Sequence, residues 1–375
     1  MQKKYTSLGL MSGTSGDGVD ASILFSNGMD QFEVIKDKYF EYDQNIYKNF
    51  HTLKEVIHSL KDLKKYSKEL LDLEKKITLF HAKIIKDISE NRTIDLIGFH
   101  GQTIYHNSRE KISNQLGNGK LLYQLTKRKI IYNFRENDIN NGGEGAPLTP
   151  IFHQLIVDKV KLDLPIIILN IGGISNATYI TSYSDTSGIS SRDIGPGNCM
   201  IDSWIRKNSK NKFDIDGKLA SLGNRNNLIY EQALELFGNR MIEEKSLSLD
   251  VNNFDISFIR GLSLEDGAAT LTDLTAKIIG TSLSVNATKI KNKIWKVLVC
   301  GGGRKNKFFM KKIKENLSKN LVIQSIDDYG LDGDFIESQA FAFLAIRSFL
   351  KLPISFPATT RCREPISGGL IIGNF

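Results

Sequence analysis

The segment GLMSGTSGDGVDASI, residues 9–23, decides how the rest of the chain is interpreted. Apolar residues on either side of it, Tyr5 to Leu10 and Val19 to Phe25, predict two strands joined by a turn around Gly13 to Gly18. The three glycines of that turn permit positive φ angles and a close approach of backbone to ligand. The hydroxyl and amide groups there suit phosphate oxygens. The segment thus indicates a phosphate-binding hairpin, with an ordinary Asp- and Gly-rich turn as the alternative.

Two carboxylates in this turn indicate a metal ion. Asp17 and Asp20 would repel phosphate by themselves, so a bridging cation is expected, most economically Mg²⁺ held through water. The predicted phosphate-binding residues of the hairpin are Gly13, Thr14, Ser15, Gly16, Asp17, Gly18, Val19 and Asp20.

A second hairpin of the same kind opens the second half of the chain. The apolar run Pro165 to Asn170 leads into a turn with Gly172 and Gly173, and a second strand follows at Asn176 to Ile180. Further on, an apolar strand runs into Gly301, Gly302 and Gly303 before a helix, where a nucleotide could be received. Neither G-x-x-x-x-G-K-[ST] nor G-x-G-x-x-G occurs, which counts against a P-loop enzyme and a dinucleotide-binding fold.

Two hairpins and a strand-Gly-Gly-helix element resemble the layout of the sugar kinase, Hsp70 and actin superfamily, in which two lobes clamp ATP and Mg²⁺. The expected fold is α/β: a two-lobed actin/hexokinase-like (ribonuclease H-like) ATPase fold with a mixed sheet and flanking helices in each lobe. We expect the first lobe at residues 1–135, completed by 355–375, and the second at 136–354. Residues 53–88 predict one long or two consecutive amphipathic helices, and a strand is expected near 121–125.

Composition excludes several classes of protein. The chain has 375 residues, of which 41% are hydrophobic and 25% charged, so it is expected to be folded and soluble. The net charge of +8 comes mostly from lysines interleaved with acidic residues, which favours a solvated helix face over nucleic-acid binding. No apolar run approaches the length of a membrane span, and three widely spaced cysteines predict a reducing, cytoplasmic environment.

The chain resembles the anhydro-N-acetylmuramic acid kinases along its whole length. The matching segments, in order, are GLMSGTSGDGVDASI (9–23), GFHGQTIYH (98–106), NFRENDINNGGEGAPLTPIFH (133–153), LNIGGISNATYI (169–180), RDIGPGNCMIDSWI (192–205), LEDGAATLTDLTA (264–276), VCGGGRKN (299–306), IESQAFAFLA (336–345) and FPATTRCREPISGG (356–369). This resemblance implies ATP-dependent conversion of 1,6-anhydro-N-acetylmuramic acid to N-acetylmuramic acid 6-phosphate and ADP, in peptidoglycan recycling. It also implies a homodimer.

The chemistry of that reaction requires a base. O6 of the substrate is tied to C1, so the acetal must open as the phosphoryl group arrives, while water adds to C1. The resemblance implies that Asp193 is this base, with a helix-capping Asp as the alternative. It places Glu337 near the sugar, although a charge that stabilises the helix dipole would explain Glu337 equally.

The resemblance assigns further sugar-binding residues to the first half of the chain: His100, Gln102, Arg135 and Asp138. A guanidinium suits the lactyl carboxylate of muramic acid, although the residues leave open which cation meets it. His100 could also be a buried histidine with its hydrogen bonds satisfied.

Two positions and two segments depart from the family pattern. Ile194 stands where Thr is commoner and Glu144 where Gln is usual. Residues 245–250 are a loose version of a Lys-Ser-Thr-Gly-Arg-Glu stretch, and residues 360–365 replace a segment richer in Gly and Pro. These departures put the fine substrate contacts in doubt more than the reaction.

Two other functions fit parts of the sequence. A conventional hexose or amino-sugar kinase acting on a free 6-hydroxyl would use the same fold and one Asp base. A nonenzymatic ATP-clamping protein is the second alternative, but it would need an extra peptide-binding domain or assembly insertions. The two expected lobes account for nearly all of the 375 residues, which leaves too few for a further domain or for long insertions.

Overall fold

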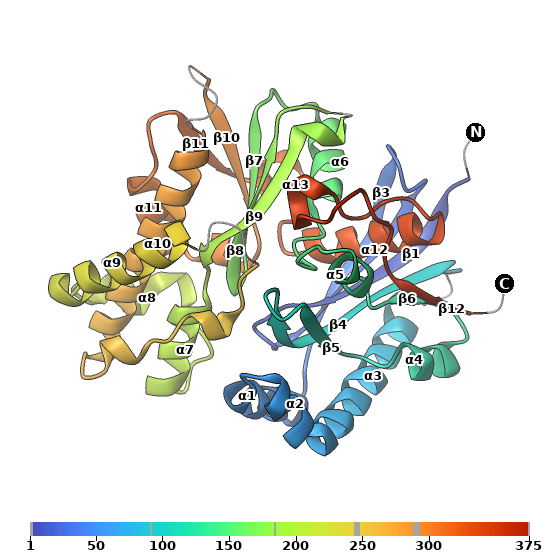
Figure 1. The fold of residues 1–375 in the computed structure, drawn as a ribbon, viewed down its shortest axis with the longest axis horizontal. Coiled ribbons are helices and arrows are strands. Elements are labelled where there is room, and N and C mark those ends of the chain that lie inside the picture. The colour runs from blue at the N-terminus through green and yellow to red at the C-terminus, as the bar shows by residue number, and fades with distance from the viewer. Residues whose placement is uncertain (1–2, 91, 184, 244–247, 288–292, 374–375) are drawn as a thin grey trace. The chain divides into compact units, whose positions relative to one another are not determined.

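The computed structural model describes residues 3–90, 92–183, 185–243, 248–287 and 293–373. The chain divides into two compact units (Figure 1). The first unit comprises Met1–Lys161, Tyr183–Ser190 and Asp334–Phe375, and the second comprises Leu162–Ser182 and Ser191–Gly333.

The first unit is built on a mixed sheet with strand order β12-β6-β4-β1-β2-β3, and β5 pairs with β4. Strands β1 and β4 are parallel, as are β4 and β6, whereas β1–β2 and β2–β3 are antiparallel. The strand bounds are β1 Tyr5–Ser12, β2 Gly18–Ser26, β3 Phe32–Glu41, β4 Leu96–Asn107, β5 Ile112–Leu116, β6 Lys129–Tyr132 and β12 Leu370–Ile372. The C-terminal strand β12 pairs antiparallel with β6, so the chain end returns to the first sheet as expected.

The helices of the first unit partly differ from the sequence-based expectation. Their bounds are α1 Gln44–Val56, α2 Leu60–Lys65, α3 Ser67–Ser89, α4 Gly119–Thr126, α5 Glu136–Asn140, α6 Pro150–Val160, α12 Ile336–Phe349 and α13 Pro357–Thr360, with a 3-10 turn at Thr186–Gly188. The region expected to hold one or two helices holds three. The strand predicted near 121–125 is wrong: helix α4 starts there because the side chain of Asn118 accepts a 2.9 Å hydrogen bond from the N–H of Leu121.

Helix α12 packs on the first sheet through two glycines. Gly9 of β1 and Gly98 of β4 are partners in the parallel register. A Cβ added at Gly9 would lie 1.9 Å from the carbonyl oxygen of Ser338, and one at Gly98 would lie 2.3 Å from that of Phe341. Only glycine lets the helix backbone approach both strands so closely. This packing explains why residues 334–354, which we expected in the second lobe, belong to the first unit.

The expected lobe boundary at residue 135 also differs from the observed division, because the first unit extends to Lys161 and includes α5 and α6. Helix α6 contacts α12, and the ring of Phe152 in α6 lies 5.5 Å from that of Phe343 in α12. Their apolar contact keeps the segment with the first sheet.

The second unit contains a sheet of order β11-β10-β7-β8-β9. Strand β10 is parallel to β7 and β11, and β7 is antiparallel to β8, so this sheet is mixed as well. The bounds are β7 Ile166–Ile171, β8 Ile174–Ile180, β9 Ile189–Pro196, β10 Trp295–Cys300, β11 Leu321–Ser325, α7 Cys199–Asn208, α8 Lys218–Leu222, α9 Asn227–Glu243, α10 Leu264–Ala287 and α11 Lys307–Glu315, with 3-10 turns at Ile215–Gly217, Val251–Asn253, Ser257–Ile259, Gly302–Lys305 and Ile326–Tyr329. The expectation of two α/β units, each with a mixed sheet and flanking helices, is confirmed.

Candidate active site

The first glycine turn joins β1 to β2 and is held by hydrogen bonds within the turn and by packing on α1. The N–H of Gly16 donates to the carbonyl oxygen of Gly13 at 3.2 Å, and Ser15 Oγ donates to Asp17 Oδ1 at 2.6 Å. Gly16 has φ +64°, and a Cβ there would lie 2.2 Å from the ring of Phe50 in α1. The turn therefore requires glycine at this position for both backbone conformation and packing.

Gln102 of β4, predicted to bind sugar, lies beside this turn. Its Nε2 donates a 2.7 Å hydrogen bond to the carbonyl oxygen of Gly13, and its side chain is fully buried. The structure thus joins a predicted sugar-binding residue to the predicted phosphate-binding turn.

Asp17 and Asp20 share one neighbour that sequence reasoning missed. The pKa of the Tyr39 hydroxyl is raised, first by burial and then by the charges of Asp17 and Asp20. A Cβ on Gly18 would lie 2.5 Å from Tyr39 Oη, so the phenol covers the turn. Since Tyr39 lies opposite Asp20 in the β2–β3 register, only the strand pairing could have revealed it.

The buried His100 and the half-buried Arg135 form a hydrogen-bonded pair in the first unit. Arg135 Nη2 lies 2.9 Å from His100 Nε2, and Nη1 donates to the carbonyl oxygen of Gly145 at 2.7 Å. Because a guanidinium only donates, Nε2 accepts and Nδ1 of His100 donates to Gly101 O at 2.7 Å. Burial, reinforced by the charge of Arg135, holds the pKa of His100 well below its usual value. His100 is therefore a neutral residue that orients Arg135.

Asp138 organises the glycine loop that follows α5. Its carboxylate is 1% exposed and accepts from the N–H of Gly145 at 2.7 Å and from Thr360 Oγ1 at 2.6 Å. A Cβ at Gly143 would lie 2.1 Å from Asp138 Oδ2, so the loop wraps closely around the carboxylate. These contacts are to protein groups, and sugar binding by Asp138 stays a prediction.

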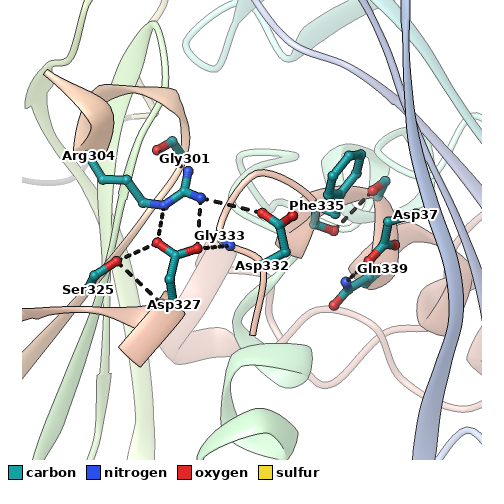
Figure 2. Close-up of polar contacts among 10 residues, drawn as sticks. Asp37, Gly301, Arg304, Ser325, Asp327, Asp332, Gly333, Phe335 and Gln339 are labelled. Carbon is teal, nitrogen blue, oxygen red and sulfur yellow. Dashed lines mark hydrogen bonds and ion pairs between the residues drawn. The ribbon is translucent and has the colours of Figure 1, made fainter. Parts of the chain in front are cut away.

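Glu337 lies in the first turn of α12, and the residues after it anchor that turn to the sheet. Gln339 Nε2 donates to Asp37 Oδ2 at 2.9 Å, and Ser338 Oγ lies 2.6 Å from Ser22 Oγ. Figure 2 shows Gln339 turned toward Asp37 of β3. The helix start that carries Glu337 is thereby fixed to β2 and β3.

In the second unit, the Gly301–Gly303 turn packs on the end of β7. Gly301 has φ +81°, and a Cβ there would lie 2.4 Å from Asn170 Oδ1; one at Gly303 would lie 2.2 Å from Ile171 Cγ2. At Gly302, by contrast, an added Cβ would meet nothing within 4 Å. Gly301 and Gly303 thus allow close packing on β7, whereas the side of Gly302 on which a Cβ would lie is unobstructed, and we call this side its open face.

The second hairpin turn also contacts the start of α7. The carbonyl oxygen of Gly172 accepts from the N–H of Asn198 at 2.8 Å, and that of Gly173 accepts from the N–H of Gly197 at 2.9 Å. The predicted residues Gly172 and Gly173 thus contact the β9–α7 connection, and the two residues before them, Asn170 and Ile171, contact the Gly301 turn.

Asp193 lies near the end of β9, next to β8 in the sheet. Its Oδ2 accepts hydrogen bonds from the N–H of Leu249 at 2.7 Å and from Ser248 Oγ at 3.1 Å. Two donors on one oxygen fix the direction of the carboxylate. Sequence reasoning missed both donors, although they belong to the departing segment 245–250; Lys245, Ser246 and Leu247 lie outside the described residues.

Across the described residues, no group of three or more His, Cys, Asp or Glu side chains is arranged to hold a metal ion directly. Asp17 and Asp20, near one phenol, fit a cation that is bound mainly by water and a ligand's phosphate oxygens. The helices of the described ranges include none with the length and apolar character needed to span a bilayer.

Known proteins resemble this chain along its whole length. A family model described as anhydro-N-acetylmuramic acid kinase matches residues 5–373. The anhydro-N-acetylmuramic acid kinase of Pelagibacter ubique is 52% identical and is covered over 100% of both chains. That of Zymomonas mobilis is 35% identical, over 97% of this chain and 98% of the relative. A ROK family glucokinase from Streptomyces griseus, solved with glucose and AMPPNP, is 10% identical with a TM-score of 0.40, over 91% of this chain and 99% of that one.

Proposed function

The chain belongs to the anhydro-N-acetylmuramic acid kinase family, and from this premise we propose that Asp193 is the general base of its reaction. The enzyme converts 1,6-anhydro-N-acetylmuramic acid, ATP and water to N-acetylmuramic acid 6-phosphate and ADP, in peptidoglycan recycling.

The proposed step combines two bond changes. Asp193 accepts a proton from water, whose oxygen adds to C1 of the sugar. The C1–O6 bond breaks, and O6 forms a bond to the γ-phosphorus as the bond to the ADP oxygen breaks. Charge that develops at C1 resembles that in inverting glycosidases, where one carboxylate also activates water.

The main support for this assignment is that two hydrogen bonds fix the side chain of Asp193. Leu249 and Ser248 donate to the same oxygen, Oδ2, and so hold the carboxylate in one orientation. A plain helix-capping Asp would instead bond the first N–H groups of the helix that follows it.

ATP binding is proposed for the three glycine turns. Backbone N–H groups around Gly13 to Gly18 and at Gly172 and Gly173 would meet phosphate oxygens, and the open face of Gly302 would meet another part of the nucleotide. Asp17 and Asp20 would hold Mg²⁺ through water. The ion would neutralise phosphate charge.

The sugar is proposed to contact the first unit. Arg135, oriented by neutral His100, supplies a fixed cation for the lactyl carboxylate, and Gln102 places an amide beside the phosphate turn. Asp138 and Glu337 complete the proposed set, the first by shaping the glycine loop and the second from the anchored start of α12. A homodimer in the cytoplasm, where ATP is available, is also proposed.

One assay tests the proposal. ADP release is followed with 1,6-anhydro-N-acetylmuramic acid, N-acetylmuramic acid and N-acetylglucosamine, and the product is identified by its anomeric proton and phosphorus resonances. We expect release with the anhydro sugar and a product phosphorylated on O6 with an opened ring bridge. A phosphorylated product that keeps the bridge would refute the mechanism, and a preference for N-acetylglucosamine would indicate a conventional 6-kinase.

A further inference from the structure

A network of hydrogen bonds centred on Arg304 lies directly after the Gly301–Gly303 turn. Arg304 Nε donates to Asp327 Oδ2 at 2.6 Å, and Nη2 donates to Asp327 Oδ1 at 2.8 Å, which makes a two-pronged ion pair (Figure 2). Nη2 also lies 3.4 Å from Asp332 Oδ1. The Arg304 side chain is only 7% exposed, whereas the side chain of Asp327 is 42% exposed, so the guanidinium is buried and its partner carboxylate faces solvent.

The remaining guanidinium nitrogen acts on the turn itself. Nη1 of Arg304 donates to the carbonyl oxygen of Gly301 at 3.1 Å, and the Arg304 backbone N–H reaches the same oxygen at 3.3 Å. In a trans peptide the carbonyl and the following N–H point in opposite directions. Arg304 therefore fixes the peptide between Gly301 and Gly302 and directs the Gly302 N–H away from the guanidinium.

A second connection holds the turn from its other side. The N–H of Gly301 donates to the carbonyl oxygen of Gly333 at 2.8 Å, and the N–H of Gly333 donates to Asp327 Oδ1 at 3.0 Å. Asp327 thus joins Arg304 and Gly333, which contact the carbonyl and the N–H of Gly301 respectively. The guanidinium holds the pKa of Asp327 well below its usual range, so the pair stays charged at neutral pH.

We propose that Arg304 is a positioning residue for nucleotide binding: through Asp327 and Gly301 it sets the orientation of the Gly302 backbone, whose open face receives the nucleotide. This inference rests on the proposed function of the Gly301–Gly302 turn. A residue needed only for stability could be exchanged for an apolar one of similar size at little cost, since an ion pair whose carboxylates face solvent contributes little net stability. The four donors of Arg304 that meet three different segments instead suit the task of fixing geometry.

The test compares nucleotide and sugar affinities in two variants. Arg304→Lys keeps the charge but cannot make the two-pronged pair and reach Gly301 at once; we expect KM for ATP to rise about tenfold, with kcat and KM for the sugar within about twofold. Asp327→Asn should act in the same direction, and the double variant should be no worse than the more affected single variant, because both changes break one network.

Lys296→Gln is the matched control. Lys296 pairs with Asp163 at the opposite end of β10, at 3.5 Å and with Asp163 94% exposed, so its loss should change neither KM. An unchanged KM for ATP in Arg304→Lys would overturn the proposal. Equal increases of both KM values together with a lower unfolding temperature would also overturn it, because they indicate a purely structural role.

Calorimetric titration with ATP in the absence of sugar separates this inference from the proposed function. About tenfold weaker ATP binding by Arg304→Lys supports the positioning role even if the wild-type protein showed no sugar-dependent ADP release. In that case the proposed function alone would fail.

Discussion

The backbone N–H of Leu249 donates a 2.7 Å hydrogen bond to Oδ2 of Asp193, which ties the proposed base to a segment 56 residues further along the chain. The donor is a main-chain group, so the identity of the side chain at 249 is not what makes the bond. This explains how a segment that departs from the family pattern can still hold the carboxylate in place.

Asp193→Asn should abolish most of the activity and leave the protein folded. The amide keeps an oxygen to accept from Leu249, whereas it cannot take a proton from water, so turnover should fall by several orders of magnitude. ATP affinity, measured by titration, should change little. Turnover near that of the wild type would eliminate Asp193 as the base.

Ser248→Ala tests the anchoring separately. It removes the longer of the two hydrogen bonds, at 3.1 Å, while Leu249 still holds Oδ2. If the Ser248 hydrogen bond stabilises the reactive orientation of the carboxylate by about 1 kcal/mol, its loss would lower kcat about fivefold. KM for ATP should not change. A loss as large as that of Asp193→Asn would contradict this division of roles and point to direct participation by the hydroxyl.

The glycine turns could be predicted from sequence because their information is local. A turn between two apolar strands is encoded within about fifteen residues, and both hairpins lie where they were expected. The role predicted for Asp193 came instead from the resemblance of residues 192–205 to a known family. The partners of these residues, such as Tyr39, Leu249 and Asp327, are distant in sequence and depend on strand order and loop packing.

The lobe boundaries illustrate the same limit. An apolar helix at 336–349 could cover either sheet, and its pattern alone does not decide which. The decision is made by Gly9 and Gly98, which become aligned only once β1 and β4 pair in parallel. Without knowledge of that register, the sequence does not reveal that α12 packs on these two glycines.

Gly9→Ala should strongly destabilise the first unit. The new methyl group would lie 1.9 Å from the Ser338 carbonyl oxygen, which belongs to helix backbone and cannot move aside, so we expect a loss of about 3 kcal/mol or more of unfolding free energy. Chemical denaturation measures it. Gly302→Ala is the matched comparison, because its methyl group meets no atom within 4 Å and stability should be retained while ATP affinity falls. Equal stability losses in the two variants would contradict the packing argument.

Glu144 and Arg361 should show a measurable coupling energy. Both positions depart from the family pattern, and their side chains form a 2.8 Å ion pair, with Glu144 only 9% exposed and Arg361 34% exposed. The N–H of Glu144 also donates to the carbonyl oxygen of Thr360, so the two departing segments are packed together. A double-mutant cycle with Glu144→Gln and Arg361→Gln should give about 1 kcal/mol of coupling in unfolding free energy. Strict additivity would show that the two departures are independent.

Three buried histidines should make the protein less stable in mild acid. Burial lowers the pKa of His81 to about 4 and that of His153 to about 3, and it lowers the pKa of His100 well below its usual value. The unfolded chain takes up a proton near the ordinary pKa of about 6.5, whereas the folded protein does not, so stability is fully present above that pH and is lost as the pH falls toward the folded pKa. Each histidine should contribute a slope of about 1.4 kcal/mol per pH unit between about pH 6 and its folded pKa. Chemical denaturation at about pH 7 and about pH 5 measures how the unfolding free energy depends on pH. Carboxylates change this free energy with the same sign, so the histidine contribution is the difference in slope between a variant and the wild type.

His81→Gln should reduce the slope, and exchange of the exposed His58 for Gln should leave it unchanged. An undiminished slope in His81→Gln would mean that His81 is charged in the folded protein despite its complete burial.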